Sequence, residues 1–247
     1  MRLPVALLLV PAITLAACSG GAPEKEGARE NAVETSANLT PRADKVNDAA
    51  VLANAFRAAF KAPEVRLGDD IYSFRPAALY RMDDRWVLLS EGSGPDCHAC
   101  SGFLAAHYLA GEPGAFSVTG GRADAIPGSS FGAPPEWRMR TDLMAAPVIE
   151  AHGGGTWQGI SCSTATLTEL APEGPALRAK DIPLLYDDTG AIVDDRAPTS
   201  VKGTVGEGQR SRNFIVRYDG SVKREIAYDR KGDLYAPAAK TDDVPQC

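Results

Sequence analysis

The residues with the clearest capacity for chemistry are Cys97 and Cys100, a Cys-x-x-Cys motif with His98 between the two thiols. Two thiols at this spacing can close a small disulfide, exchange it with another dithiol, or hold a metal ion. Covalent attachment of haem needs a histidine directly after the second cysteine, and Ser101 occupies that position. The motif therefore predicts disulfide or metal chemistry, and the compartment of the protein decides between them.

The N-terminus indicates export. Arg2 is followed by a mostly apolar stretch, Leu3–Leu15, which is too short to cross a ~30 Å hydrocarbon core as a helix and suits a signal peptide. The stretch ends in Leu15-Ala16-Ala17-Cys18. This sequence resembles the lipobox of bacterial lipoproteins, in which the preceding peptide is removed and the cysteine carries acyl chains. The resemblance covers residues 1–20 and implies a signal peptide at 1–17 and lipidation at Cys18.

A lipidated Cys18 would anchor the protein. Two or more acyl chains hold a protein firmly on a membrane, whereas one chain binds marginally. Ser19 follows the cysteine, and in proteobacterial lipoproteins an aspartate at that position tends to signal retention in the inner membrane. The resemblance therefore implies that lipid on Cys18 attaches the protein to a membrane, which is its expected partner. It also implies a location in the cell envelope, on the periplasmic side of the outer membrane.

Composition divides the rest of the chain into a tether and a domain. Residues 18–45 are rich in small and polar residues and contain no aromatic residue, which predicts a flexible tether. Residues 46–247 are predicted to form a single β-rich domain, since 44% of the 247-residue chain is hydrophobic. The net charge of −6 lacks the basic footprint of a nucleic-acid-binding protein, so we expect no nucleic-acid partner.

The hydrophobic pattern predicts one helix and a series of hairpins. Asn47-Asp48 offers a cap for an amphipathic helix over 47–61. The predicted hairpins pair Ala77–Met82 with Arg85–Ser90, Gly102–Ala110 with Ala115–Gly120, Pro147–His152 with Thr156–Leu170, and Asn213–Tyr218 with Val222–Tyr228. Residues 121–144 are predicted to be a long loop. The expected fold is all-β, a β-rich sandwich or open barrel of antiparallel hairpins, with the helix packed outside.

Setting Cys18 aside leaves an even number of cysteines: Cys97, Cys100, Cys162 and Cys247. An even number in an exported protein indicates disulfides, and four cysteines allow three pairings. We favour Cys97–Cys100 with Cys162–Cys247. The second bridge closes a long loop and would stabilise by about 3–5 kcal/mol in the chain-entropy model, whereas the first closes a very short one. A bridge of little structural value is the place to look for function.

A zinc site would need ligands beyond the two thiols of the motif. His107 could be the third ligand, and His98, His152 or Cys162 the fourth. An oxidising compartment favours disulfides over thiolate ligands. We therefore predict no metal and no cofactor.

A redox role for Cys97 and Cys100, with His98 between them, is the alternative. The motif resembles that of thioredoxin-like proteins, in which the first cysteine lies at a helix N-terminus that lowers its pKa. The resemblance implies a strand at Trp86–Leu89 and a helix at Ser101–Ala110, and Pro147 matches the proline that faces the active cysteines in that family. Residues 111–146 are too rich in Gly and Pro for that fold, and the residues after Gly102 also alternate as a strand.

Signals of a serine hydrolase are incomplete. His152-Gly153-Gly154-Gly155 matches an oxyanion loop, and Gly159–Ser163 nearly matches a nucleophile elbow. The two motifs lie too close together, and no histidine follows His152 to complete the triad. We expect the three glycines to form a tight connection between two strands.

The sequence therefore predicts a membrane-anchored, periplasm-facing lipoprotein that is a non-catalytic structural or binding module. Neither its ligand nor a protein partner follows from the residues. The alternative is a thiol–disulfide redox protein that uses Cys97 and Cys100.

Overall fold

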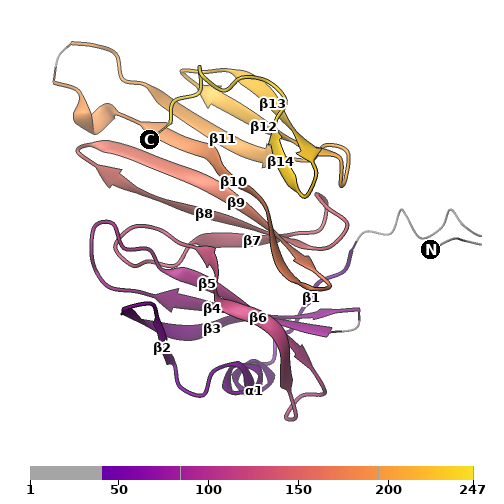
Figure 1. Cartoon of the computed structure of the whole chain (residues 1–247). Helices are drawn as coiled ribbons and strands as arrows, with labels where there is room; N and C mark the ends of the chain where they lie inside the picture. The colour runs from indigo at the N-terminus through magenta and orange to yellow at the C-terminus, as the bar shows by residue number, and fades with distance from the viewer. Residues whose placement is uncertain (1–40, 84, 194, 247) are drawn as a thin grey trace, which may run out of the picture. The chain divides into compact units, whose positions relative to one another are not determined.

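The computed structural model describes residues 41–83, 85–193 and 195–246, and the predicted signal peptide, Cys18 and most of the predicted tether lie outside them. The described residues form two antiparallel sheets and one α-helix (Figure 1). Neither sheet closes into a barrel within these residues. The predicted all-β class with a single N-terminal helix is confirmed.

The first sheet contains six strands in the order β1-β3-β4-β5-β6, with β2 also paired to β3. Their bounds are β1 Asp44–Lys45, β2 Glu64–Leu67, β3 Asp70–Met82, β4 Arg85–Ser93, β5 Phe103–Ala110 and β6 Ser117–Pro127. Strands β3 and β4 pair antiparallel, as do β5 and β6, which confirms the first two predicted hairpins. Because β1 pairs with β3, the sheet takes in the last two residues of the predicted 18–45 tether.

The second sheet is an eight-stranded meander in which each strand lies beside its neighbours in sequence. Its strands are β7 Glu136–Arg140, β8 Val148–Trp157, β9 Ile160–Ala171, β10 Gly174–Asp187, β11 Ser200–Gly206, β12 Asn213–Gly220, β13 Arg224–Lys231 and β14 Leu234–Pro237. A single 3-10 turn, η1 (Thr189–Ala191), separates β10 from β11.

Three details of the predicted strands were wrong. Glycines 153–155 lie inside β8 rather than between two strands, and the turn falls at Gln158 and Gly159, whose φ values are 51° and 83°. β12 runs through Gly220, so the last hairpin turns at residues 221–223. The predicted loop 121–144 contains the end of β6 and the whole of β7. In each case the partner strand continues opposite these residues, and ladder hydrogen bonds outweigh the local preference of Gly and nearby Pro for turns and loops.

The helix α1 (Ala49–Ala59) is shorter than the predicted 47–61 but begins at the predicted cap. The Asp48 carboxylate accepts hydrogen bonds from the backbone N–H groups of Ala50 and Val51, which satisfies two donors that the helix cannot pair itself. Ala55 is fully buried and packs with Leu79, Leu88 and Leu109 of the first sheet. Figure 1 shows α1 on the face of this sheet that is turned away from the second sheet. No helix among the described residues has the length and apolar character to span a membrane.

Apolar side chains of the two sheets meet in a shared core. The first sheet contributes residues of β3, β4 and β5, among them Tyr80, Leu89 and Leu104, and the second contributes Ile149, Ala151 and Leu170. Alternate residues of β8 and β9 point the other way, into a separate core that includes Val148, Ala165 and Leu167. One face of β8 and β9 therefore packs against the first sheet. Their other face packs into the separate core that the second sheet forms with its own strands.

Candidate functional site: a cleft at the open end of the core between the sheets

The shared core opens into a cleft along one face of β9. Leu170 lies in the core and Thr168 is 2% exposed, and the next residues on that face are Thr166, Thr164 and Cys162. These three line a cleft of about 310 Å³. The side chains on this face of β9 are therefore apolar in the core between the sheets. They carry hydroxyl groups farther along the strand, where the two sheets no longer cover them.

The same face of β8 carries glycines and an aromatic residue. Ile149 and Ala151 belong to the core, Gly153 and Trp157 line the cleft, and Gly155 lies between them. A Cβ on Gly155 would lie 2.9 Å from ring carbons of Trp157, so the indole lies back over this glycine. The missing side chain lets the indole lie along the strand and form part of the cleft.

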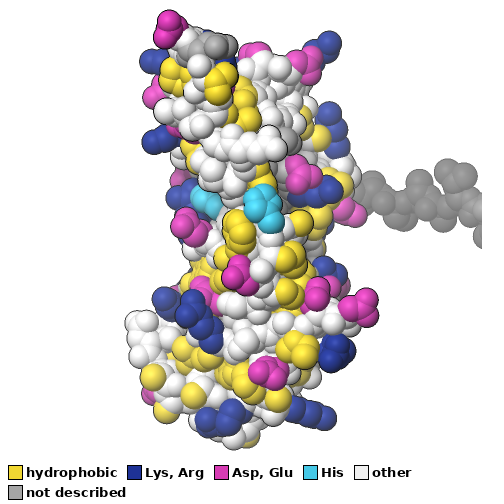
Figure 2. Space-filling view, turned by 90° about the vertical axis from the view of Figure 1, so that its left-hand side faces the viewer, with side chains coloured by type: hydrophobic (Ala, Val, Ile, Leu, Met, Phe, Trp, Pro, Cys, Tyr) yellow, Lys and Arg dark blue, Asp and Glu magenta, His cyan; other side chains and the backbone are white. Residues whose placement is uncertain are grey.

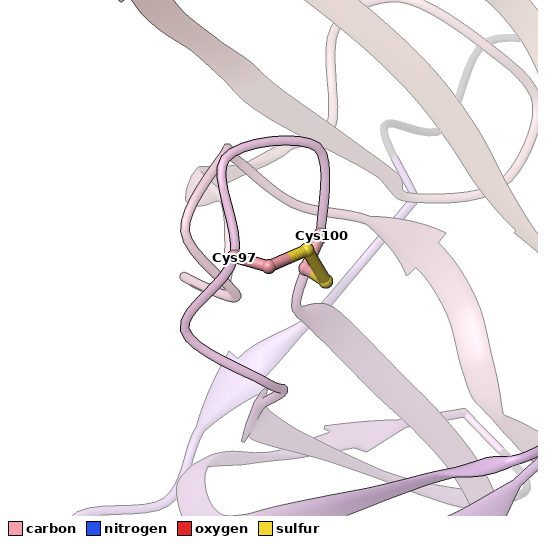
Figure 3. The surroundings of a disulfide bond; sticks show 2 residues. All are labelled: Cys97 and Cys100. Atoms are coloured by element: carbon pink, nitrogen blue, oxygen red, sulfur yellow. A yellow bond between two sulfur atoms is a disulfide. The ribbon is translucent and has the colours of Figure 1, made fainter.

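A disulfide turn forms another wall of the cleft. Cys97 and Cys100 are joined by a disulfide (Figure 3). Their Cα atoms are 5.0 Å apart, and the Cys100 N–H donates to the Cys97 carbonyl at 3.0 Å. Cys97 is exposed and Cys100 is half-buried. The exposed ring of His98, at the tip of the turn, lies 5.1 Å from the ring of Phe131 and 6.0 Å from that of Trp157, measured between centroids. The face shown in Figure 2 carries histidine side chains bordered by hydrophobic ones.

Backbone hydrogen bonds fix this turn to the loop of residues 128–134. The Gly132 N–H donates to the Cys100 carbonyl at 2.9 Å, and the Gly94 N–H donates to the Gly132 carbonyl at 2.8 Å. Glycine is required at residue 132, where φ is +67° and a Cβ would lie 2.5 Å from the Pro95 carbonyl oxygen. The disulfide turn is therefore part of a rigid corner.

The same loop is joined to β8. The Ser130 N–H donates to the Gly154 carbonyl at 3.1 Å, and the Gly154 N–H donates to Ser129 Oγ at 3.3 Å. A Cβ on Gly153 would lie 2.4 Å from the Gly128 carbonyl oxygen. The glycines of β8 therefore allow the loop to cross the strand in direct backbone contact.

Three residues around the cleft hold a left-handed backbone that only glycine adopts readily. They are Phe131, Gln158 and Asp181, with φ values of 57°, 51° and 55°. Asp181 lies at an irregularity of β10, between Ala179 and Ile182, and lines the cleft. Gln158 takes this conformation in the β8–β9 turn, and Ser211, which does not line the cleft, shares it at a φ of 61°. Such residues cost about 1–3 kcal/mol each, and Asp181 is the one of the four that lines the cleft.

The structure brings together some of the predicted site residues and separates others. His98, Cys100 and Cys162 line the cleft. His107 does not: it is 9% exposed on the other face of β5, 5.0 Å from the ring of Phe60, and burial lowers its pKa. Cys18 and Cys247 lie outside the described residues, so the Cys162–Cys247 pairing and lipidation stay predictions.

The described residues do not assemble a zinc site at the Cys-x-x-Cys motif. Cys97 and Cys100 are joined to each other, so neither offers a thiolate. Within the described ranges, no group of three or more His, Cys, Asp or Glu side chains is placed to hold a metal ion.

The thioredoxin-like context at the motif is wrong. Residues after Gly102 form β5, so the segment for which the resemblance implies a helix, Ser101–Ala110, is a strand. The one α-helix of the described residues is Ala49–Ala59, and its N-terminus does not adjoin the motif. The adjacent charged side chain is Asp96, which would oppose a thiolate rather than stabilise it. Any redox chemistry at this turn would therefore lack the helix dipole on which that family depends.

A second polar centre lies on the opposite face of β8. Glu150 is 1% exposed and accepts hydrogen bonds from Arg138 at 2.7 and 2.9 Å and from Arg140 at 2.5 Å. His152 Nε2 lies 2.8 Å from Glu150 Oε1. Burial alone would raise the pKa of Glu150, but the hydrogen bonds from His152 and the two arginines hold it below its usual value.

This centre borders a second cleft of about 370 Å³, which His152, Ser161 and Ser163 line. His152–Gly155 are consecutive residues of β8, and Gly159–Ser163 lead from a turn into β9. A nucleophile elbow needs a turn from a strand into a helix. No hydrogen bond joins His152 to a serine in the part of the chain that the structure describes. The sequence motifs of a hydrolase are thus parts of a hairpin.

Sequence reasoning missed the threonines. Thr164, Thr166 and Thr168 recur at every second residue of β9, on the face whose inner end is core. A polar residue repeated with the period of a strand, between Cys162 and Leu170, is the signal that could have located the cleft.

Comparisons with protein-family models, curated protein sequences and solved structures found no match for this chain.

Proposed function

We propose that this chain is a lipid-anchored protein of the cell envelope, facing the periplasm from the outer membrane, and that it is a non-catalytic module that binds a small ligand in the cleft. The observation that carries the binding role is the cleft itself. It combines an indole, a row of hydroxyl groups and a rigid disulfide corner. Binding sites for small molecules are typically preformed hollows with a few fixed polar groups among apolar ones.

The contacts of His98 support a binding role. Its ring neighbours are Phe131 and Trp157, so it adds a further ring to the aromatic wall of the cleft. The Leu15–Cys18 lipobox motif and the even set of later cysteines support the location.

The anchor is tested by the variant Cys18→Ala, expressed in a Gram-negative host and followed by cell fractionation. We expect the native chain in the outer-membrane fraction with a mass that includes acyl chains. The variant should be released to the periplasm or stay unprocessed. Unchanged processing and membrane retention of Cys18→Ala would reject lipidation at this residue.

A thiol–disulfide role for Cys97 and Cys100 is the second candidate. The exposure of Cys97 favours it, because a partner thiolate could reach that sulfur. The reduction potential of the pair, measured in the full chain against glutathione, separates the two candidates. A potential below about −300 mV fits a structural bridge, whereas about −120 to −270 mV fits an exchange protein.

A further inference from the structure

We infer that the ligand of the cleft is a short neutral glycan, with the face of one sugar ring against the Trp157 indole and its hydroxyl groups bonded to Thr164 and Thr166. This inference rests on the proposed binding function and names its ligand class. The volume of about 310 Å³ lies at the lower end of small-molecule sites, which run from about 300 to 1,000 Å³.

The aromatic wall suits a flat ring with C–H groups on its face. The indole of Trp157 is half-buried and lies over Gly155, and the ring of His98 lies 6.0 Å from it, between centroids, at an interplanar angle of 70°. The face of an aromatic ring is electron-rich and attracts groups that carry partial positive charge. The C–H bonds on one face of a pyranose are such groups, and they form a patch of matching flatness.

The hydroxyl row supplies the polar half of the site. Thr164 and Thr166 are half-buried, and among the described residues no protein group bonds to their hydroxyls or to Trp157 Nε1. A threonine hydroxyl donates one hydrogen bond and accepts others, as does each hydroxyl of a sugar. The residues of the cleft therefore offer unpaired groups of the kind that a polyol can satisfy.

The charges around the cleft disfavour anionic and cationic ligands. None of the residues that line the cleft, all of them described, is Lys or Arg, so a phosphate or carboxylate ligand would find no compensating charge. Asp181 is the single carboxylate of the lining. Its side chain is 76% exposed and lies 3.5 Å from Lys180, which compensates its charge and weakens the case for a cationic ligand.

The test is titration of the full chain, purified in a detergent without a sugar headgroup, with four probes: tetrasaccharides of N-acetylglucosamine, glucose, galactose and mannose. Binding is followed by calorimetry and by tryptophan fluorescence. We expect saturable binding of at least one probe, a loss of more than about tenfold in affinity in Trp157→Ala, and about a five- to tenfold loss in each of Thr164→Val and Thr166→Val. Valine keeps the shape of threonine and removes only the hydroxyl.

Two matched variants serve as controls. Thr204→Val changes an exposed threonine of β11, and Trp86→Phe changes a tryptophan that contacts Phe116 and Arg81 away from the cleft. Both should bind as the native chain does, and circular dichroism verifies that every variant is folded. A folded Trp157→Ala that retains full affinity would place the glycan elsewhere and overturn the inference.

Two further probes separate failure of the glycan class from failure of the proposed function. Choline represents cationic ligands, and a tripeptide of alanine represents short peptides. Binding of either one, lost in Trp157→Ala, with no binding of the four tetrasaccharides, would reject the glycan and keep the cleft as a binding site. Absence of binding by all six probes at millimolar concentration would overturn the glycan inference, while the anchor is decided separately by Cys18→Ala.

Discussion

Arg140 of β7 places its Nη1 2.5 Å from Oε2 of Glu150 on the neighbouring strand β8. The guanidinium side chain is 12% exposed and the carboxylate side chain 1%. The same Nη1 donates to the Val205 carbonyl at 3.1 Å. One buried ion pair therefore connects β7, β8 and β11, beneath the face of β8 that is opposite the cleft.

Replacing Glu150 should be costly because its buried carboxylate accepts hydrogen bonds from Arg138 and Arg140, although Arg140 keeps Asp142 as a counter-charge. We expect Glu150→Gln to lower the free energy of unfolding by about 1–3 kcal/mol, measured by chemical denaturation. The control is Glu225→Gln, which removes the carboxylate of an exposed pair with Arg217 and should cost less than about 1 kcal/mol. Equal losses in the two variants would show that burial of Glu150 does not govern its contribution.

Because the 128–134 loop crosses β8 in direct contact, we expect a strict requirement for glycine at residue 153. A Cβ on Gly153 would lie 2.4 Å from the Gly128 carbonyl oxygen, whereas a Cβ on Gly120 would meet nothing within 4 Å. We expect Gly153→Ala to cost about 1–3 kcal/mol and to weaken binding in the cleft, and Gly120→Ala to be nearly neutral. Thermal denaturation of the two variants side by side provides the measurement, and a neutral Gly153→Ala would contradict the close approach.

The burial of His107 predicts a dependence of stability on pH. Burial lowers its pKa in the folded state, so the unfolded chain takes up its proton first as the pH falls through about 6.5. This residue therefore removes stability as the pH falls through that value. Its Nδ1 is buried without a partner, so His107→Leu breaks no hydrogen bond at that atom. Between pH 7.5 and pH 5.5 the native chain should lose more stability than His107→Leu, and parallel curves would refute the prediction.

The disulfide turn should survive the loss of its bridge. A loop of four residues contributes about 2 kcal/mol in the chain-entropy model, and the hydrogen bonds from Gly132 to Cys100 and from Gly94 to Gly132 do not depend on the sulfurs. We expect the double variant Cys97→Ser with Cys100→Ser to stay folded, with a loss of about 2 kcal/mol or less. Denaturation and circular dichroism of this variant test the expectation, and an unfolded chain would show that the bridge is essential.

Local signals in the sequence were sufficient for the fold class, the helix and the Cys97–Cys100 bridge. The period of apolar residues and the Asp48 cap act over a few residues, and a disulfide between neighbours needs only a turn. The same reasoning failed at glycines 153–155. Their neighbours in sequence favour a turn, but their neighbours in space are β9 and the 128–134 loop.

The sequence by itself determined a strand-rich domain with a disulfide between Cys97 and Cys100, and it predicted an anchor at Cys18. Only the tertiary structure showed that Trp157 and the row of threonines lie beside the disulfide turn. It also showed that His107 lies on the side of the first sheet that faces the helix. The reason is physical. Alternation along a strand fixes which residues share a face, but which face meets the other sheet depends on contacts between residues far apart in the chain.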